Sequence, residues 1–278
     1  MPMLNFRIVR PAVLIDIGRL AGLDDVQVRV GGGLTVGALT KHRTLETSPL
    51  VARHFPVIPD VMQHVAHLAI RNRGTIGGSL SHADPAAELP MLARLLDAVI
   101  TACSVRGERA IRAADFFDGS LATVLAEDEM VVRVDLPGLP DGMGWGFDEV
   151  ARRAGDFALA AVAVLLHVRG GTIAEARIAM MGVGATPLRC PEAEAVLTGQ
   201  VLSDALVART VQAACAPLRP NLDVHASSEY RRHLAGVLVA RAVRSAWRRA
   251  GGDAVRAGSG AGAGVASGAP QSGRQDPR

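Results

Sequence analysis

The sequence contains few aromatic residues and almost no lysine. Aromatic residues make up 3% of its 278 residues, and Lys41 is the only lysine. The basic residues are therefore nearly all arginine, and they exceed the acidic residues by only 30 to 27. With so few aromatic rings for stacking on bases, and no nucleic-acid-binding motif, the composition does not indicate a nucleic-acid partner.

Cysteine pairs and long apolar runs are also missing. Cys103, Cys190 and Cys215 lie far apart and form no Cys-x-x-Cys pair. This spacing argues against a disulfide framework, and three thiols cannot supply the four ligands of an iron–sulfur cluster. No apolar run approaches the roughly 20 residues that span a bilayer, and no basic-then-apolar signal pattern opens the chain. We expect a soluble, cytoplasmic protein without a membrane span.

What the sequence does contain is enough apolar residues, 49% of the chain, for two ordinary cores. A run of turn residues at 137–142 marks the boundary between them. We therefore expect an α+β chain with one domain over residues 1–140 and a smaller α+β domain over 142–250. Small residues and proline dominate 251–278, which predicts a disordered tail.

Local patterns predict the elements within these domains. Glycines 31–33 predict a turn that pairs strand 26–30 with strand 34–38. Ser227 or Ser228 is expected to cap a helix over 229–250, and residues 40–69 read as helical segments broken by prolines. The other expected strands are 12–17, 98–105, 130–136, 157–168 and 173–182, and the other expected helices are 89–96, 191–197 and 203–214; the breaks are expected at Pro49, Pro56 and Pro59.

The most informative stretch is residues 72–90, Asn-Arg-Gly-Thr-Ile-Gly-Gly-Ser-Leu-Ser-His-Ala-Asp-Pro-Ala-Ala-Glu-Leu-Pro. Gly77 and Gly78 allow a tight backbone turn that brings N–H groups close to a ligand, because no Cβ stands in the way. Successive N–H groups in such a turn form a nest for phosphate oxygens. A glycine turn before a capped helix, without any ligand, is the competing interpretation, and the glycine pair alone does not decide between them.

The polar residues around the glycines fit a nucleotide-like ligand. Thr75 and Ser79 can add hydroxyl donors beside the turn. The carboxylates of Asp84 and Glu88 can accept hydrogen bonds from sugar or ribityl hydroxyl groups, whereas neither suits a pyrophosphate.

The same string resembles the second FAD-binding motif of the FAD-binding subunit of the molybdenum hydroxylases, the carbon monoxide dehydrogenase and xanthine dehydrogenase family. That motif is a Thr-Ile-Gly-Gly turn, a polar residue, and later an Asp-Pro and an acidic residue. Segments 3–17, 146–158 and 229–235 are similar to other parts of the family, so the likeness spans roughly residues 3 to 249. It implies FAD contacts at Thr75, Ile76, Gly77, Gly78, Ser79, Asp84 and Glu88, and a contact with the flavin edge at Val131.

The resemblance also implies a fold, partners and an activity. The fold would be a PCMH-like FAD-binding domain followed by the CO dehydrogenase flavoprotein C-terminal domain. The subunit would have neither a metal nor catalytic residues of its own. Its FAD would take electrons from the 2Fe–2S clusters of a small partner and pass them to NAD, a quinone or another acceptor, while a large molybdenum-cofactor subunit hydroxylates the substrate.

One part of the family pattern is missing. The family's first flavin motif, an Ala-Gly-Gly-x-Ser loop, belongs immediately before Pro2, where this sequence begins. We therefore expect an N-terminally truncated FAD-binding domain that holds FAD weakly, unless the true start lies upstream of Met1. The alternative function is a non-catalytic assembly or remnant subunit that has lost FAD binding.

Two other constellations carry less weight. His64 and His67, with His82 downstream, lack a carboxylate at matching spacing, which disfavours a metal site. The residue types of a hydrolytic triad also occur, at Ser79, Ser81, His82 and Asp84. They lie too close together in the sequence to converge on one point, and no G-x-S-x-G elbow is present, which disfavours hydrolysis.

Overall fold

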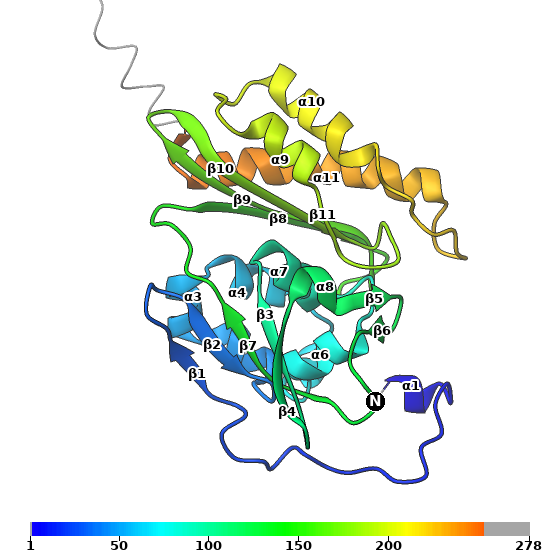
Figure 1. Ribbon diagram of the computed structural model, residues 1–278. Helices are drawn as coiled ribbons and strands as arrows, with labels where there is room; N and C mark the ends of the chain where they lie inside the picture. Colours follow the sequence, from blue (N-terminus) through cyan, green and yellow to red (C-terminus); the bar gives the residue numbers. More distant parts are fainter. Residues whose placement is uncertain (1, 253–278) are drawn as a thin grey trace, which may run out of the picture.

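The computed structural model describes residues 2–252, which form two sheets stacked with helices between and outside them (Figure 1). The helices between the sheets belong to the first half of the chain, and the three helices on the far side of the second sheet belong to the second half. The tail predicted over 251–278 lies, from residue 253 onward, outside the described residues. Within residues 2–252, no helix combines the length and apolar character needed to cross a bilayer.

The first sheet is antiparallel and has five strands in the order β1-β2-β7-β3-β4. The predicted hairpin between β1 and β2 is confirmed, with Val26 opposite Val36. Its turn requires glycine at two positions, because Gly31 and Gly32 have φ angles of 85° and 80°. The strands are β1 Val26–Val28, β2 Leu34–Gly37, β3 Val99–Ser104, β4 Gly107–Arg112 and β7 Met130–Leu136, and a separate small pair is β5 Phe117–Gly119 with β6 Ala122–Thr123.

Short helices accompany this sheet, and prolines set some of their limits. Pro49 begins α3 at a position where its missing N–H has no partner to lose, and Ser48 caps the helix by accepting from the Val51 N–H at 3.4 Å. Pro59 does not break a helix as predicted, because it lies in the first turn of α4, where amides have no intrahelical acceptor. The helices are α1 Pro2–Asn5, α2 His42–Thr47, α3 Pro49–His54, α4 Val57–Met62, α5 Leu68–Arg71, α6 Ile76–His82, α7 Glu88–Leu95 and α8 Ala113–Phe116.

The strand predicted over 12–17 is wrong. These residues form no regular element, and Val13, Leu14 and Ile15 are 74%, 67% and 81% exposed. Their apolar and β-branched character suits a strand, but no strand within residues 2–252 pairs with them to accept their backbone hydrogen bonds.

The second sheet is antiparallel in the order β11-β10-β9-β8, and three helices cover its outer face (Figure 1). The predicted β9–β10 hairpin and the long final helix are confirmed, with Ser227 accepting from the Tyr230 N–H at 3.1 Å as the cap of α11. The strands are β8 Gly144–Ala151, β9 Ala158–Arg169, β10 Thr172–Met181 and β11 Leu188–Arg189, and the helices are α9 Pro191–Leu197, α10 Asp204–Cys215 and α11 Ser228–Arg249.

Strand β9 serves two hydrophobic cores. Ala161, Ala163 and Leu165 pack with the core of the first half, whereas Val162 and Val164 pack with the core under α11. Side chains alternate across a strand, so each face of this sheet is covered by different helices. The face toward the first half contacts α4 and α7.

Polar contacts also join the halves. Arg189 donates to the carbonyl oxygens of Arg94 and Leu95 at the end of α7, at 3.0 and 3.3 Å, and pairs with Asp97 at 2.8 Å. The Trp145 Nε1–H donates to Asp60 of α4 at 2.7 Å. These contacts fix the second sheet on α4 and α7 of the first half.

Candidate functional site

The glycine pair of the motif lies in a helix. Thr75 is the N-cap of α6, and its Oγ1 accepts from the Gly78 N–H at 3.1 Å. Gly77 and Gly78 are therefore part of the first helical turn, and the tight glycine turn predicted from the sequence is wrong. The capping threonine explains the difference, because it satisfies an otherwise unpaired amide and starts the helix one residue before the glycines.

Gly77 is required for packing. Its N–H donates to the Ala38 carbonyl at 2.8 Å, and a Cβ at this position would lie 2.6 Å from the Ala38 Cβ. The Ile76 N–H donates to the Thr40 carbonyl at 3.0 Å, and the Ile76 side chain is buried. The first two amides of α6 thus bond to the segment after β2, so the phosphate nest expected from Gly77 is occupied by protein carbonyls.

Gly78 and Ser79 are on the open side of the same turn. Gly78 is exposed, and a Cβ there would meet only the Thr75 Oγ1, at 2.9 Å. The Ser79 hydroxyl has no hydrogen-bond partner among the described residues. A ligand can therefore approach the backbone at Gly78 closely and find a free hydroxyl beside it.

Two residues that the sequence analysis missed hold this turn in place. His42 Nε2 lies 3.0 Å from the Thr75 carbonyl oxygen, and burial lowers the pKa of this histidine. A neutral ring with its proton on Nε2 therefore donates to the cap residue. Lys41 bridges to Thr75 through the backbone and donates from Nζ to the Arg73 carbonyl at 3.3 Å. The only lysine of the chain thus lies beside the N-terminus of α6, although nothing in its sequence context marked it.

The two carboxyl groups of the motif follow α6 directly. Ala83, with φ of 52°, ends the helix, and the Asp84 Oδ1 accepts from the Ala86 N–H at 2.9 Å. Glu88 begins α7 and is 7% exposed. Burial raises the pKa of Glu88 to about 7, and the negative charge of Asp84 contributes to the same direction.

The structure therefore brings the motif residues together on α6, the loop after it and the start of α7. Val131 is not exposed beside these residues, because its side chain is 4% exposed and belongs to the core of the first half. His64 packs edge-on against Phe147, with ring centroids 4.9 Å apart. In the described part of the chain, no three His, Cys, Asp or Glu side chains converge as metal ligands.

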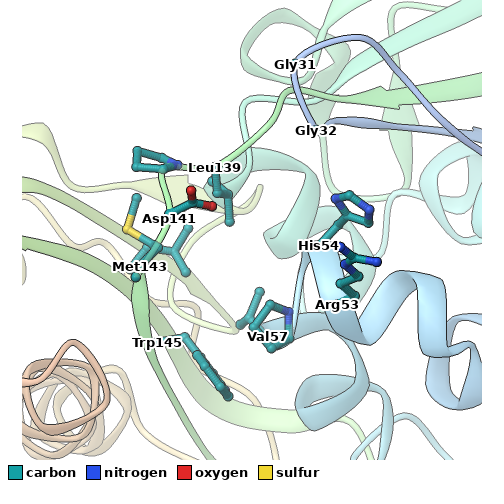
Figure 2. Close-up of a pocket in the computed structure, with 13 residues that line it drawn as sticks. Gly31, Gly32, Arg53, His54, Val57, Leu139, Asp141, Met143 and Trp145 are labelled. Atoms are coloured by element: carbon teal, nitrogen blue, oxygen red, sulfur yellow. The ribbon is translucent and has the colours of Figure 1, made fainter.

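A cavity of about 330 Å³ lies at a different place, between the first-half helices and the segment that leads into β8 (Figure 2). Arg53 and His54 line one side, and Asp141 and Trp145 line the other. None of the seven predicted contact residues lines it. The candidate site is thus the open surface of α6 and its following loop, separate from this cavity.

These features define a class of protein. A helix start with an open glycine, a free hydroxyl and nearby carboxyl groups is suited to holding a polar cofactor, and the site contains no activated nucleophile. The chain belongs to the FAD-binding subunits of the molybdenum hydroxylase family, of the carbon monoxide dehydrogenase type. Residues 1–139 match the family described as "FAD binding domain in molybdopterin dehydrogenase", and residues 145–246 match "CO dehydrogenase flavoprotein C-terminal domain".

Relatives of known function carry names from the same family. The chain is 40% identical to the 6-hydroxypseudooxynicotine dehydrogenase complex subunit alpha of Paenarthrobacter nicotinovorans, over 90% of this chain and 84% of the relative. It is also 40% identical to the nicotine 6-hydroxylase medium subunit of that organism, over 90% of this chain and 87% of the relative. These names describe subunits of oxidoreductase complexes.

Solved structures agree with these matches. The fold superposes on a chain of quinoline 2-oxidoreductase from Pseudomonas putida 86 with a TM-score of 0.85 and 39% identity, covering 90% of this chain and 86% of the other. It superposes on a chain of carbon monoxide dehydrogenase from Hydrogenophaga pseudoflava with a TM-score of 0.86 and 35% identity, covering 89% and 86%. The α+β fold, the oxidoreductase class and FAD as the cofactor are confirmed.

Proposed function

We propose that this chain holds FAD along the open side of α6 and passes electrons through it. The electrons would come from the 2Fe–2S clusters of a small partner subunit and leave to NAD, a quinone or another acceptor. The observation that supports this most directly is the exposed Gly78 with the free Ser79 hydroxyl beside it at the start of α6, on the helix that leads to the carboxyl groups of Asp84 and Glu88. When bound, the flavin supplies the redox chemistry, and the chain supplies binding and orientation.

Each residue of the motif has a distinct part in this proposal. Thr75 caps α6, and Ile76 and Gly77 hold the helix against the core, so these three shape the site from beneath. Gly78 and Ser79 contact the flavin nucleotide. Asp84 and Glu88 accept hydrogen bonds from its hydroxyl groups, as ionised carboxylates do.

The partners in the proposal follow from what this chain does not provide. The thiols of Cys103, Cys190 and Cys215 are free, and burial raises the pKa of Cys190 to about 12. Such a thiol is a poor source of the thiolate that iron requires. We therefore assign the 2Fe–2S clusters to a small subunit and substrate hydroxylation to a large molybdenum-cofactor subunit. Free thiols also fit a cytoplasmic location.

The experiment that tests the flavin site is Gly78→Val in the full chain. A branched side chain on the open face blocks close approach of a ligand, and within the protein its Cβ would meet only the Thr75 Oγ1, at 2.9 Å. We expect FAD per protein, measured by absorbance after gel filtration, to fall at least tenfold, while circular dichroism stays unchanged. Full FAD occupancy in this variant would contradict the assignment. A wild-type chain that binds no FAD would support the alternative of a non-catalytic assembly subunit.

A further inference from the structure

The cavity between the first-half helices and the segment that leads into β8 is apolar at its base (Figure 2). Val57 of α4 and Leu165 of β9 line it and are buried, and Met143 and Trp145 line it beside them. Its volume of about 330 Å³ lies at the lower end of the range for small-molecule sites, roughly 300 to 1,000 Å³. A base of this kind suits a flat apolar group of one or two fused rings.

Trp145 provides an aromatic surface in the cavity. The guanidinium carbon of Arg249 lies 4.5 Å from the centroid of its ring, and the Trp145 Nε1–H donates to Asp60 at 2.7 Å. Neither Arg249 nor Asp60 lines the cavity, so the cavity meets the part of the indole that these two residues leave uncovered. The two contacts hold the indole in place, and a ring held in this way offers a surface on which an aromatic ligand can stack.

Three polar side chains surround this base without partners among residues 2–252. Arg53 and His54, in the last turn of α3, line one side of the cavity, and Asp141 lines the other (Figure 2). None of these side chains makes a hydrogen bond or an ion pair within the described chain, and Arg53 and Asp141 stay apart although their charges are opposite. A ligand with an anionic group at one end and a hydrogen-bond donor at the other can bind both sides.

The rim of the cavity is held by contacts of the chain itself. Gly31 and Gly138 pack so closely that a Cβ on Gly138 would overlap the Gly31 carbonyl oxygen, and this contact joins the β1–β2 turn to the segment after β7. In that segment the Met143 N–H donates to the Pro140 carbonyl at 3.3 Å, so Asp141 lies within a closed turn. A rim that is already ordered loses less conformational entropy when a ligand binds.

We propose that this cavity is a second ligand site, separate from the surface of α6, for a small planar aromatic anion that carries a hydrogen-bond donor at its opposite end. The anionic group binds Arg53, whose guanidinium can donate two parallel hydrogen bonds to a carboxylate. The donor binds the Asp141 carboxylate, and the ring stacks on Trp145. The ligand thereby contacts both halves of the chain, and the proposal does not depend on FAD.

The probe that tests this site is 6-amino-2-naphthoate, titrated into the full chain at pH 7 and followed by isothermal titration calorimetry. We expect saturable binding with a dissociation constant below about 1 mM. 2-Naphthoate, which lacks the donor, should bind about fivefold more weakly. 6-Amino-2-naphthamide, which lacks the negative charge, should bind at least about tenfold more weakly. Absence of saturable binding of the first probe, or equal binding of all three, would overturn the proposal.

Variants assign the two ends of the ligand. Arg53→Met should weaken 6-amino-2-naphthoate at least about tenfold. The matched control is Arg209→Met on α10, because Arg209 is exposed, has no ion pair within residues 2–252 and lies away from the cavity, and its effect should stay below about twofold. Asp141→Ala should abolish the fivefold preference for the amino compound over 2-naphthoate. Equal losses in the two arginine variants, or a preference that survives Asp141→Ala, would contradict the assignment.

A competition experiment separates this site from the flavin site. Saturating FAD should leave the affinity for 6-amino-2-naphthoate within about twofold, because none of the proposed FAD contacts lines the cavity. Competition between FAD and the probe would make the cavity part of the flavin site and overturn the proposal of a second site.

Discussion

Gly77→Ala is expected to destabilise the fold, whereas Gly78→Ala, one residue later, is not. A Cβ at residue 77 would lie 2.6 Å from the Ala38 Cβ and 2.8 Å from the Ala38 carbonyl oxygen. Ala38 is 2% exposed and its carbonyl accepts the Gly77 N–H, so α6 has to shift away from β2 and stretch that bond. Overpacking of this kind costs about 1–3 kcal/mol, and a weakened hydrogen bond adds about 1 kcal/mol.

The better helix propensity of alanine offsets up to about 1 kcal/mol of this cost. We therefore expect the free energy of unfolding, measured in urea, to fall by about 1–3 kcal/mol in the Gly77→Ala variant. Gly78→Ala gains the same propensity, and this gain offsets the cost of a close contact between its Cβ and the Thr75 Oγ1 at 2.9 Å, so its stability should stay within about 0.5 kcal/mol of the wild type. Equal stability of the two variants would refute the assignment of Gly77 to packing and of Gly78 to the open face.

Two further variants probe the interface and the site. Arg189→Met removes the donor to the Arg94 and Leu95 carbonyls and the arginine partner of Glu194, while Asp97 keeps its pair with Arg177. Thermal and urea unfolding should therefore show a loss of about 2–4 kcal/mol. A loss as small as that of the exposed Arg106→Met, below about 1 kcal/mol, would show that the contact is dispensable. Ser79→Ala should weaken FAD binding about fivefold in titration calorimetry with unchanged stability, and unchanged affinity would remove Ser79 from the flavin contacts.

The sequence predicted the elements whose signals are local. The β1–β2 turn follows from adjacent glycines, and α11 follows from a serine cap with an apolar stripe behind it. The strand predicted over 12–17 failed because a strand also needs a neighbour, which composition does not reveal. The conformation of the glycine pair was mispredicted for a similar reason. Glycine is needed at residue 77 because a Cβ there would collide with Ala38, which is distant in the chain.

The candidate site was located because residues 72–90 resemble a FAD-binding motif of the family. The residues that support the site from other parts of the chain were not predicted. His42 matters because its ring reaches the carbonyl of Thr75, and Lys41 matters because it bridges to Thr75 and donates to the Arg73 carbonyl. Neither residue belongs to a motif of its own. Spacing along a chain reports which residues share a helix or strand, but not which distant groups meet when two sheets are stacked.

The two-sided burial of β9 has a consequence for the order in which the protein can fold during synthesis. The core that contains Leu34 also contains Leu165 on β9 and Met181 on β10. When the linker at 137–143 leaves the ribosome, the helices of the first half still lack the sheet face that covers them. That core is fully covered only after β10 has emerged. The opposite face of β9 and β10 stays exposed until α11 has also been made. The nascent chain therefore carries an uncovered apolar surface until nearly all of the described sequence has been made.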